Sequence, residues 1–504
     1  MRRVLDGASE RQQRVHRSIG RPVAIHPGHL VPGHLHGQAV HHAAVELLGG
    51  EPGPHRPSAL APPGPAYHNA RSSISHPNIG GLKVSSAHEA RAVVVGGGTV
   101  GLCCAMHLLR RGYEVTVVDR SAPGNGASGH NAGLFSVGNC LPTSTPGVIR
   151  SVPRMLTDPH SPLAIRWRYL PRMLPWLLRF LASGRPAQVE RASVAIAGLV
   201  KQALRAWEDV LPAGASEGVV IDGGHLLGYG TDAVFAKAAF AIETRRRRGI
   251  DMRILDAEGV AGLAPILEGR FRHGVYIPRG PWADPRLLCA ALTDLLVSEG
   301  GRRLSAEVSG FAQSDDRVTV VETAEEKVAA DLVVIAAGAW SKHLTRMLGF
   351  TTPLDTERGY GVDLPDPGVD LPFPIISMDH HFAMTPLPGG LRLAGTDELA
   401  GLEAPPDFRR ADRLVDATRL VFPELRTHGA ESWMSYRPSH PDSLPVIGRA
   451  PRHTNVYLAY GHGHIGFTLA AITGEIIGQM VSNEEPSLDP APFRPTRFRI
   501  LERR

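Results

Sequence analysis

Residues 92–119 carry the clearest pattern of apolar and polar positions in the chain. A short apolar run predicts a buried strand, and the glycine-rich stretch 96–98 ends it. The residues that follow have the spacing of an amphipathic helix, and a second apolar run ends at Asp119. We therefore expect a strand, a helix and a parallel strand in direct succession.

The turn in this unit has the glycine spacing of a dinucleotide-binding loop. Gly96 permits the tight turn, and Gly98 lets the backbone approach a pyrophosphate. Gly101 lets the helix pack closely on the strand. Because strand, turn and helix follow one another in the required order, the pattern predicts dinucleotide binding.

The helix start and the end of the second strand add to this prediction. The helix opens at Thr99 and Val100, where free N–H groups and a partial positive charge face the phosphates. Asp119 lies 23 residues after Gly96 and is followed by Arg120. A carboxylate at this place accepts hydrogen bonds from ribose hydroxyls.

Helical and strand-like patterns alternate through the rest of the chain. Helical spacing recurs at 146–210, 232–248, 284–298, 408–422 and 466–481. Strand patterns occur at 216–229, 274–278, 303–311, 318–322, 331–336 and 354–400. We expect an α/β protein with a Rossmann-like dinucleotide-binding domain and an interleaved antiparallel-sheet substrate domain. The first takes residues 91–145, 274–345 and 430–485, and the second takes 146–273 and 346–429.

The first ninety residues differ in composition from the rest. They contain 11 of the 24 histidines and ten prolines, with little sustained periodicity. We expect residues 1–90 to be a disordered or non-native extension outside the folded domains. The histidines of this region suggest a metal site, but biased composition accounts for them, and we expect no metal. The histidines in question are His34, His36, His41 and His42.

Composition and charge narrow the class of protein. A chain of 504 residues with 43% apolar residues has room for two substantial domains. The net charge is +5 and no long basic run occurs, so we expect no nucleic-acid partner. The four cysteines form no CxxC pair, which indicates a reducing compartment and a cytoplasmic protein. No apolar stretch predicts a transmembrane span or a secretory signal.

Five motifs resemble those of one flavoenzyme family. They are the unit 92–119, the small-residue loop 126–133, the segment 146–180 rich in arginine and tryptophan, the strand and turn 331–340, and the stretch 433–448 with the turn 461–466. Together they resemble the flavin-dependent D-amino acid oxidase superfamily over about residues 91–495. The resemblance is strongest to bacterial D-amino acid dehydrogenases and related hydroxyproline and glycine-type enzymes. The last three motifs imply FAD rather than NAD as the cofactor.

The resemblance implies which segments hold FAD. Short polar side chains of the loop 126–133 donate to pyrophosphate oxygens, with two small residues beside them. One later strand gives adenine a backbone contact, and another ends at a residue without a side chain. The last glycine-rich turn opens a helix whose N-terminus faces the flavin. In this order the residues are Ser128, Asn131, Ala132, Gly133, Val308, Gly338, Gly461, His462, Gly463, His464 and Gly466.

The resemblance also implies two residues in the substrate site. Arg437 matches the arginine of a Trp-x-x-x-Arg-Pro motif, and its planar guanidinium can hold a carboxylate by two parallel hydrogen bonds. A structural arginine at a domain boundary is the alternative. Tyr360, in the sequence Arg-Gly-Tyr, matches a tyrosine that faces the site.

The implied reaction oxidises a D-amino acid or cyclic imino acid. A hydride passes from Cα to flavin N5, giving an imine and then a 2-oxo acid, and a quinone or another carrier takes the electrons. Residues 163–182 mix arginine with tryptophan and leucine, which suits either contact with the inner face of a bacterial membrane or helices packed on the substrate domain.

Three alternatives to this reading stay open. The first is a glycine-, sarcosine- or proline-type oxidase that uses oxygen. The second is a flavoprotein subunit of a multi-subunit amine dehydrogenase. The third concerns His130, because a histidine in dimethylglycine-type relatives bonds the flavin covalently.

Overall fold

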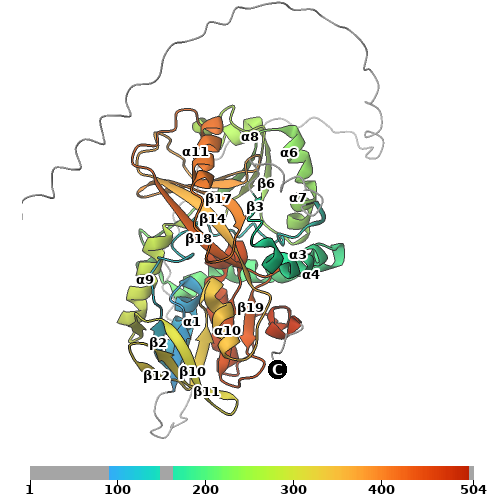
Figure 1. Ribbon diagram of the computed structural model, residues 1–504. Coiled ribbons are helices and arrows are strands. Elements are labelled where there is room, and N and C mark those ends of the chain that lie inside the picture. Colours follow the sequence, from blue (N-terminus) through green and yellow to red (C-terminus); the bar gives the residue numbers. More distant parts are fainter. Residues whose placement is uncertain (1–89, 148–162, 499–504) are drawn as a thin grey trace, which may run out of the picture. The chain divides into compact units, whose positions relative to one another are not determined.

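The computed structural model describes residues 90–147 and 163–498, which build two main sheets with their helices (Figure 1). The expectations for residues 1–90, for their histidines and for the helical pattern at 148–162 lie outside the described residues. Within the described residues, no helix is long and apolar enough to cross a membrane.

A six-stranded sheet carries the predicted strand–helix–strand unit. Its order is β19-β20-β13-β1-β2-β9, parallel throughout except for β19 against β20. Helix α1 (Thr99–Leu109) connects β1 to β2, as the sequence predicts. The strands are β1 (Arg91–Val95), β2 (Glu114–Val118), β9 (Arg302–Leu304), β13 (Leu332–Ile335), β19 (Val446–Arg449) and β20 (Val456–Tyr460).

Both faces of this sheet are covered, which explains why its strands are apolar along their whole length. Helices α1, α9 (Pro285–Ser298) and α12 (Gly466–Val481) bury one face. Helix α10 (Ser341–Met347) and a small antiparallel sheet bury the other. The small sheet consists of β10 (Val308–Ser314), β11 (Arg317–Thr323) and β12 (Lys327–Ala329).

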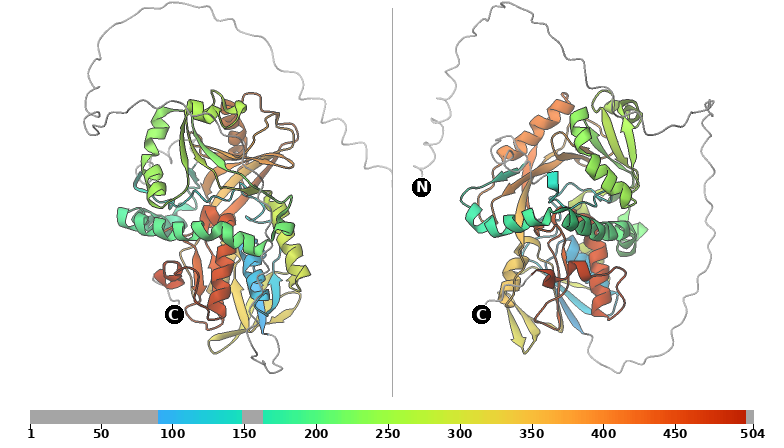
Figure 2. Two further views of the ribbon diagram at one scale, coloured as in Figure 1. Left: turned by 180° about the vertical axis from the view of Figure 1, so that it is seen from behind. Right: turned by 90° about the vertical axis from the view of Figure 1, so that its right-hand side faces the viewer.

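Helix α12 is buried almost all round, because it packs on α1 and on α4 (Pro186–Val210). Gly474 of α12 lies against the backbone of Cys103 in α1, where a Cβ would come within 2.6 Å of the Cys103 carbonyl group. The small residue lets the two helices approach closely. Seen from behind, α4 runs past α12 between the two main sheets (Figure 2).

A nine-stranded and largely antiparallel sheet forms the second region. Its order is β18-β14-β17-β16-β15-β5-β7-β6, and β3 pairs with β17. Only β15–β5 and β17–β3 are parallel among its described pairs. The strands are β3 (Leu163–Ile165), β5 (His225–Tyr229), β6 (Arg253–Asp256), β7 (His273–Ile277), β14 (Asp355–Leu364), β15 (Ile375–Ser377), β16 (Phe382–Leu387), β17 (Gly390–Leu399) and β18 (Glu431–Ser439).

Short elements complete the described chain. A two-stranded sheet pairs β4 (Val220–Ile221) with β8 (Trp282–Ala283). The further helices are α3 (Leu170–Ser183), α5 (Ala213–Ser216), α6 (Asp232–Lys237), α7 (Ala239–Arg247), α8 (Ala257–Ala261) and α11 (Arg409–Val421). The 3-10 turns are η1 (Pro265–Leu267), η2 (Gly338–Trp340), η3 (Gly463–Ile465), η4 (Ala491–Phe493) and η5 (Pro495–Arg497).

The predicted fold class is observed: a parallel sheet and a second, largely antiparallel sheet are built from interleaved segments. Two strands lie in a different sheet from the one expected. Strand β7 pairs with β5 and β6, and β18 pairs with β14, although we assigned both to the dinucleotide-binding domain. A strand's partner depends on contacts distant in sequence, which local pattern does not specify.

Candidate active site

A cavity of about 510 Å³ lies where the glycine-rich turns of the parallel sheet meet the second sheet. A volume of this size is typical of small-molecule and cofactor sites. All but three of the predicted site residues line it. The three exceptions are Gly101, Gly133 and Tyr360.

The first glycine-rich turn, residues 96–98, leads directly into helix α1 and is tightly packed. Gly96 has φ +113°, and a Cβ there would come within 2.5 Å of the Ala336 carbonyl oxygen. A Cβ at Gly98 would lie 2.8 Å from Ser128 Oγ, so a side chain would fill this part of the cavity. Gly101 packs directly on the Gly96 carbonyl, which is the close helix–strand packing that the sequence predicts.

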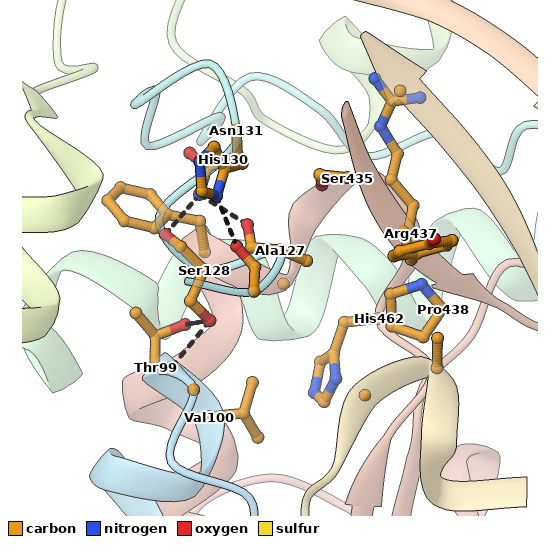
Figure 3. Close-up of a pocket in the computed structure, with 18 of the residues that line it drawn as sticks. Thr99, Val100, Ala127, Ser128, His130, Asn131, Ser435, Arg437, Pro438 and His462 are labelled. Atoms are coloured by element: carbon orange, nitrogen blue, oxygen red, sulfur yellow. Dashed lines mark hydrogen bonds between the residues drawn. The ribbon is translucent and has the colours of Figure 1, made fainter. Parts of the chain in front are cut away.

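Ser128 caps helix α1 from the loop 126–133. Its Oγ accepts a hydrogen bond from the Thr99 N–H at 2.9 Å and lies 3.3 Å from Thr99 Oγ1 (Figure 3). The hydroxyl therefore sits at the positive end of the helix, beside Val100 in the cavity wall. This is where the sequence predicts the pyrophosphate.

The amide of Asn131 organises the same loop. Its Nδ2 donates to the carbonyls of Ala127 at 3.1 Å and Ser128 at 2.8 Å, and its Oδ1 accepts from the Gly133 N–H at 2.8 Å. Gly133 has φ +73° and lies against the Ala283 carbonyl outside the cavity. Asn131 and its neighbour Ala132 line the cavity, but this amide is already engaged within its own loop.

His130 lies at the edge of the cavity. Its Nδ1 is 3.2 Å from the Gly126 carbonyl oxygen, and its ring is 5.6 Å from the Trp433 ring. Burial lowers the pKa of His130, and Arg286 and Arg392 lower it further. The imidazole is therefore neutral near pH 7.

Asp119 holds its expected place at the end of β2. Its Oδ2 accepts from the Gly97 N–H and its Oδ1 from the Ser121 N–H, both at 2.7 Å. Two backbone donors fix the carboxylate where ribose hydroxyls can reach it.

Arg120 lines the end of the cavity that also contains Glu307 and Trp340. Its guanidinium pairs with Glu307 at 2.8 Å and lies 4.8 Å from the centroid of the Trp340 ring. Val308 and Gly338, which has φ +52°, also line this end. Trp340, Val308 and Gly338 give this end a flat, apolar surface with Arg120 and Glu307 at its edge, which suits a planar base.

The last glycine turn closes the opposite wall. Gly461 and Gly463 have φ +84° and +56°, and helix α12 begins at Gly466. His462 is buried in this turn with its Nε2 3.0 Å from Thr473 Oγ1. Burial lowers the pKa of His462 to about 3, so the ring is neutral. At this position the turn presents backbone and a neutral ring to the cavity.

Arg437 lies on β18 at the substrate end. Its Nη1 donates to the Thr396 carbonyl at 2.9 Å and forms an ion pair with Asp397. The guanidinium packs over Gly359 of β14, where any Cβ would overlap it. A bare glycine on the facing strand is what lets this side chain lie along the sheet.

His464 joins two carboxylates beside Arg437. Its Nε2 is 2.6 Å from Glu357 Oε2 and 4.0 Å from Asp397 Oδ1. Burial opposes the charged form, but Asp397 and Glu357 together raise the pKa of His464. Glu357, Asp397 and His464 also have the residue types and spacing of a metal site. Because His464 and Arg437 already pair with these two carboxylates, the group is better described as an ion-pair cluster.

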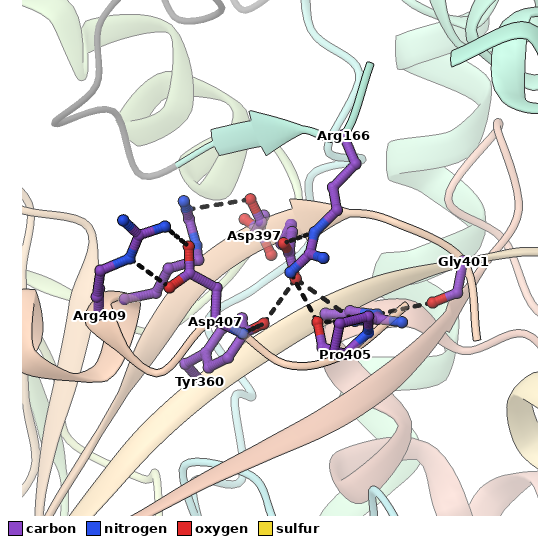
Figure 4. A network of polar contacts seen from close by, with 10 residues as sticks. Arg166, Tyr360, Asp397, Gly401, Pro405, Asp407 and Arg409 are labelled. Carbon is purple, nitrogen blue, oxygen red and sulfur yellow. Dashed lines mark hydrogen bonds and ion pairs between the residues drawn. The ribbon is translucent and has the colours of Figure 1, made fainter. Parts of the chain in front are cut away.

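Tyr360 is not brought to the cavity. Its hydroxyl donates to Glu398 Oε2 at 2.6 Å and accepts from the Asp407 N–H at 2.9 Å (Figure 4). Glu398 also pairs with Arg166 at 2.7 Å and with the fully buried Arg358 at 3.7 Å. The structure therefore places Tyr360 in a buried polar network behind the wall of the cavity.

Three residues of the site were not predicted from the sequence. They are the carboxylates Glu357 and Asp397 beside Arg437, and Arg392, which fixes the loop 126–133. Arg392 of β17 is buried, pairs with Asp363 at 2.7 Å, and donates to the carbonyls of Gly129 and Asn131. The glycines at 359 and 361 alternate with larger residues, and Glu357 lies two residues before the first of them on the same face of the strand, which was a usable signal for Glu357. No local signal marks Asp397, because it reaches the cavity through a bulge.

The donor set of the cavity fits FAD. One end offers a capped helix N-terminus, bare glycines and the fixed Asp119 carboxylate, as a pyrophosphate and ribose require. The opposite end offers the 461–466 turn, most of whose residues line the same cavity. Gly96 and Gly98 mark a backbone cradle that side chains would fill.

Comparison with known proteins agrees with this description. The family described as "DAO: FAD dependent oxidoreductase" matches residues 91–480. A D-amino-acid oxidase of Bradyrhizobium diazoefficiens is 35% identical over 413 residues, covering 80% of this chain and 98% of that protein. A D-amino acid dehydrogenase of Vibrio vulnificus is 32% identical, covering 80% and 98%.

The fold has a counterpart among solved structures. The glycine oxidase of Geobacillus kaustophilus superposes with a TM-score of 0.63 at 22% identity, covering 82% of this chain and all of that one. At this identity the likeness concerns the fold. From the family match and the two relatives, the chain belongs to the DAO family of FAD-dependent oxidoreductases.

Proposed function

We propose that this protein oxidises D-amino acids to imino acids with FAD as cofactor. The observation that carries the proposal is Arg437 in the wall of the cavity, paired with Asp397, which lies 4.0 Å from His464 of the last glycine turn. The names of the relatives, an oxidase and a dehydrogenase of D-amino acids, support the substrate class.

Under this proposal the cofactor residues divide into two groups. The turn at 96–101, Ser128 and Asp119 hold the pyrophosphate and ribose, and Arg120, Val308 and Gly338 surround the adenine. The residues of 461–466 contact the flavin ring. FAD, when bound, supplies the acceptor for the hydride that leaves Cα.

The chain's own residues bind and orient the amino acid. Arg437 holds the carboxylate by two charged hydrogen bonds, worth about 1.5–3 kcal/mol each. His462 is neutral, so its ring adds no charge near the reacting carbon. His464 keeps a proton at Nε2 against Glu357. The described cavity positions the substrate, and orientation is the main catalytic contribution of the protein.

We further propose that a quinone or another carrier, rather than oxygen, takes up the electrons. Helix α3 and the residues before it support delivery at a membrane. Trp167 is 65% exposed, and Leu174 and Leu178 are 49% and 58% exposed. Arg168, Arg172 and Arg179 are exposed around them. An apolar face with a cationic rim suits an anionic lipid surface.

Trp176 belongs to the protein interior, not to this surface. It is buried, and its Nε1 donates to the Ser439 carbonyl at 3.2 Å. Helix α3 thus has one face on the protein and one face outward.

An anaerobic panel tests the proposal. FAD-loaded protein is mixed with D- and L-amino acids, glycine, sarcosine and hydroxyproline isomers, and loss of flavin absorbance is followed. We expect D-amino acids to bleach the flavin and L-isomers not to do so. The bleached protein is then given oxygen or a soluble quinone. Faster recovery with the quinone supports a dehydrogenase, whereas rapid recovery with oxygen and peroxide formation identifies the oxidase.

A further inference from the structure

We propose that Asp397 forms an ammonium-binding subsite that is masked by Arg437 until a substrate arrives. In the free protein the two side chains neutralise each other. A zwitterionic amino acid exchanges with both: its carboxylate takes Arg437, and its ammonium takes the released Asp397. This inference rests on the proposed function and adds a requirement for both charges on the substrate.

A bulge in β17 brings Asp397 to the cavity. Arg358 of β14 lies opposite Glu398, but Tyr360 lies opposite Gly395, so the pairing shifts between them. β17 therefore carries an extra residue at this point. Thr396 has φ +57°, a left-handed conformation that a β-branched residue rarely adopts. Such bulges re-aim side chains next to active sites.

The network behind the bulge holds it in place. Glu398, the next residue, is buried and bonded to Tyr360, Arg166 and Arg358 (Figure 4). Because Glu398 is fixed on one face of the sheet, Asp397 is directed to the other face. Thr396 and Asp397 both line the cavity.

Arg437 is the group that a substrate carboxylate needs, and Asp397 already occupies it. The guanidinium makes its ion pair with Asp397 and donates to the Thr396 carbonyl. A simple carboxylate that takes the place of Asp397 on Arg437 leaves Asp397 with His464, 4.0 Å away, as its remaining ion-pair partner among the described residues. His464 compensates Asp397 only in part, because its Nε2 is 4.0 Å from Asp397 and 2.6 Å from Glu357.

An α-amino acid removes this penalty. Its ammonium is one carbon away from its carboxylate, so binding at Arg437 brings the cation next to Asp397. No bond forms or breaks in the exchange, since one ion pair is replaced by two. The pocket therefore discriminates against acids without an amine and against amines without a carboxylate.

Asp397→Asn tests the exchange, because the exchange predicts different effects on the binding of two ligands. Propionate and D-alanine are titrated against the FAD-loaded protein, the first by the flavin spectrum and the second by anaerobic reduction. We expect propionate to bind about tenfold or more tighter than to the unmodified protein, the weight of one charged hydrogen bond, because the variant has no Arg437–Asp397 pair to break. We expect D-alanine to bind within about threefold of its affinity for the unmodified protein, because the variant lacks one ion pair in the free state and one in the complex.

If Asp397→Asn acts only through the electrostatics of Arg437, both ligands bind more tightly. If the substitution damages the structure of the site, both ligands bind more weakly. Either result overturns the subsite, as does unchanged binding of propionate. A loss confined to D-lysine and D-arginine also overturns it, because Asp397 would then bind a substrate side chain. Asp407→Asn is the matched control, since Asp407 belongs to the same network but not to the cavity wall, and we expect unchanged binding of both ligands.

The two proposals fail separately. If no amino acid reduces the flavin of the unmodified protein, the proposed function is wrong. The propionate titration still measures competition between Asp397 and a carboxylate for Arg437. If amino acids reduce the flavin but Asp397→Asn shifts both ligands alike, only the subsite is wrong.

Discussion

Tyr360→Phe separates a structural role from a role in the reaction. The Tyr360 side chain is fully buried, and burial raises the pKa of its hydroxyl to about 12, so the group stays a hydrogen-bond donor. It donates to the Glu398 carboxylate at 2.6 Å and accepts from the Asp407 N–H at 2.9 Å. The variant removes both hydrogen bonds and keeps the ring in place beside Phe408.

The expected cost follows from these two bonds. A hydrogen bond to a charged group contributes about 1.5–3 kcal/mol, and a neutral one about 0.5–1.5 kcal/mol. The variant therefore loses about 2–4 kcal/mol of unfolding free energy. For a large domain, about 1 kcal/mol moves the thermal midpoint by roughly 2–4 °C, so we expect a fall of at least about 4 °C.

Thermal unfolding, monitored by flavin release, gives the midpoint of unfolding. Anaerobic mixing with substrate gives the rate of flavin reduction. We expect the rate of flavin reduction to change by less than about threefold at a temperature where the variant is folded. Tyr436→Phe is the matched variant, because the Tyr436 ring lines the cavity and its hydroxyl makes a single bond, to the Leu402 carbonyl. A Tyr360→Phe protein with an unchanged midpoint and a rate lowered a hundredfold would refute the structural role.

Three further predictions concern the cofactor, the ion-pair cluster and α3. Gly98→Val is expected to yield folded protein with little bound flavin, because the side chain meets Ser128 in the cradle; normal flavin content would contradict the proposed pyrophosphate site. Folding raises the pKa of His464, so its pairing stabilises the fold fully below about pH 6.5 and is lost as the pH rises through the folded-state pKa. His464→Gln should therefore lower the thermal midpoint more at about pH 6 than at about pH 9, and an equal effect at both would exclude this pairing. Leu174→Ser with Leu178→Ser should reduce binding to anionic vesicles, and unchanged binding would remove the proposed membrane surface.

The cofactor half of the site was predictable because its chemistry is local. Strand, glycine turn, helix and Asp119 lie within 28 consecutive residues, and each carries its own pattern. The positions of Gly96, Gly98 and Asp119 follow from that pattern alone. Asn131 is different: its place in the cavity wall was expected, but the bonds of its amide within the loop depend on how the loop folds.

The substrate half depends on the register of distant strands. On β14, Gly359 faces Arg437 and Gly361 faces Trp433, so Tyr360 between them points to the opposite face. That alternation could have been read from the two glycines once Arg437 was placed on the adjacent strand. The position of Asp397 could not, because one extra residue in β17 reverses the face on which it lies.

Anaerobic titration of Arg437→Ala with D-alanine tests most directly whether an amino acid is oxidised on Arg437. Arg437→Ala loses two charged hydrogen bonds to the carboxylate but has no Arg437–Asp397 pair to break, so the net loss is one charged hydrogen bond of about 1.5–3 kcal/mol. This predicts a half-saturating concentration raised by roughly tenfold or more. Arg437→Lys keeps the charge without the paired geometry and should fall between the two proteins. We expect D-alanine to reduce the flavin of the unmodified protein readily and that of Arg437→Ala only at much higher concentration. Equal half-saturation in the two proteins, or no reduction of either, would contradict amino acid oxidation at this site.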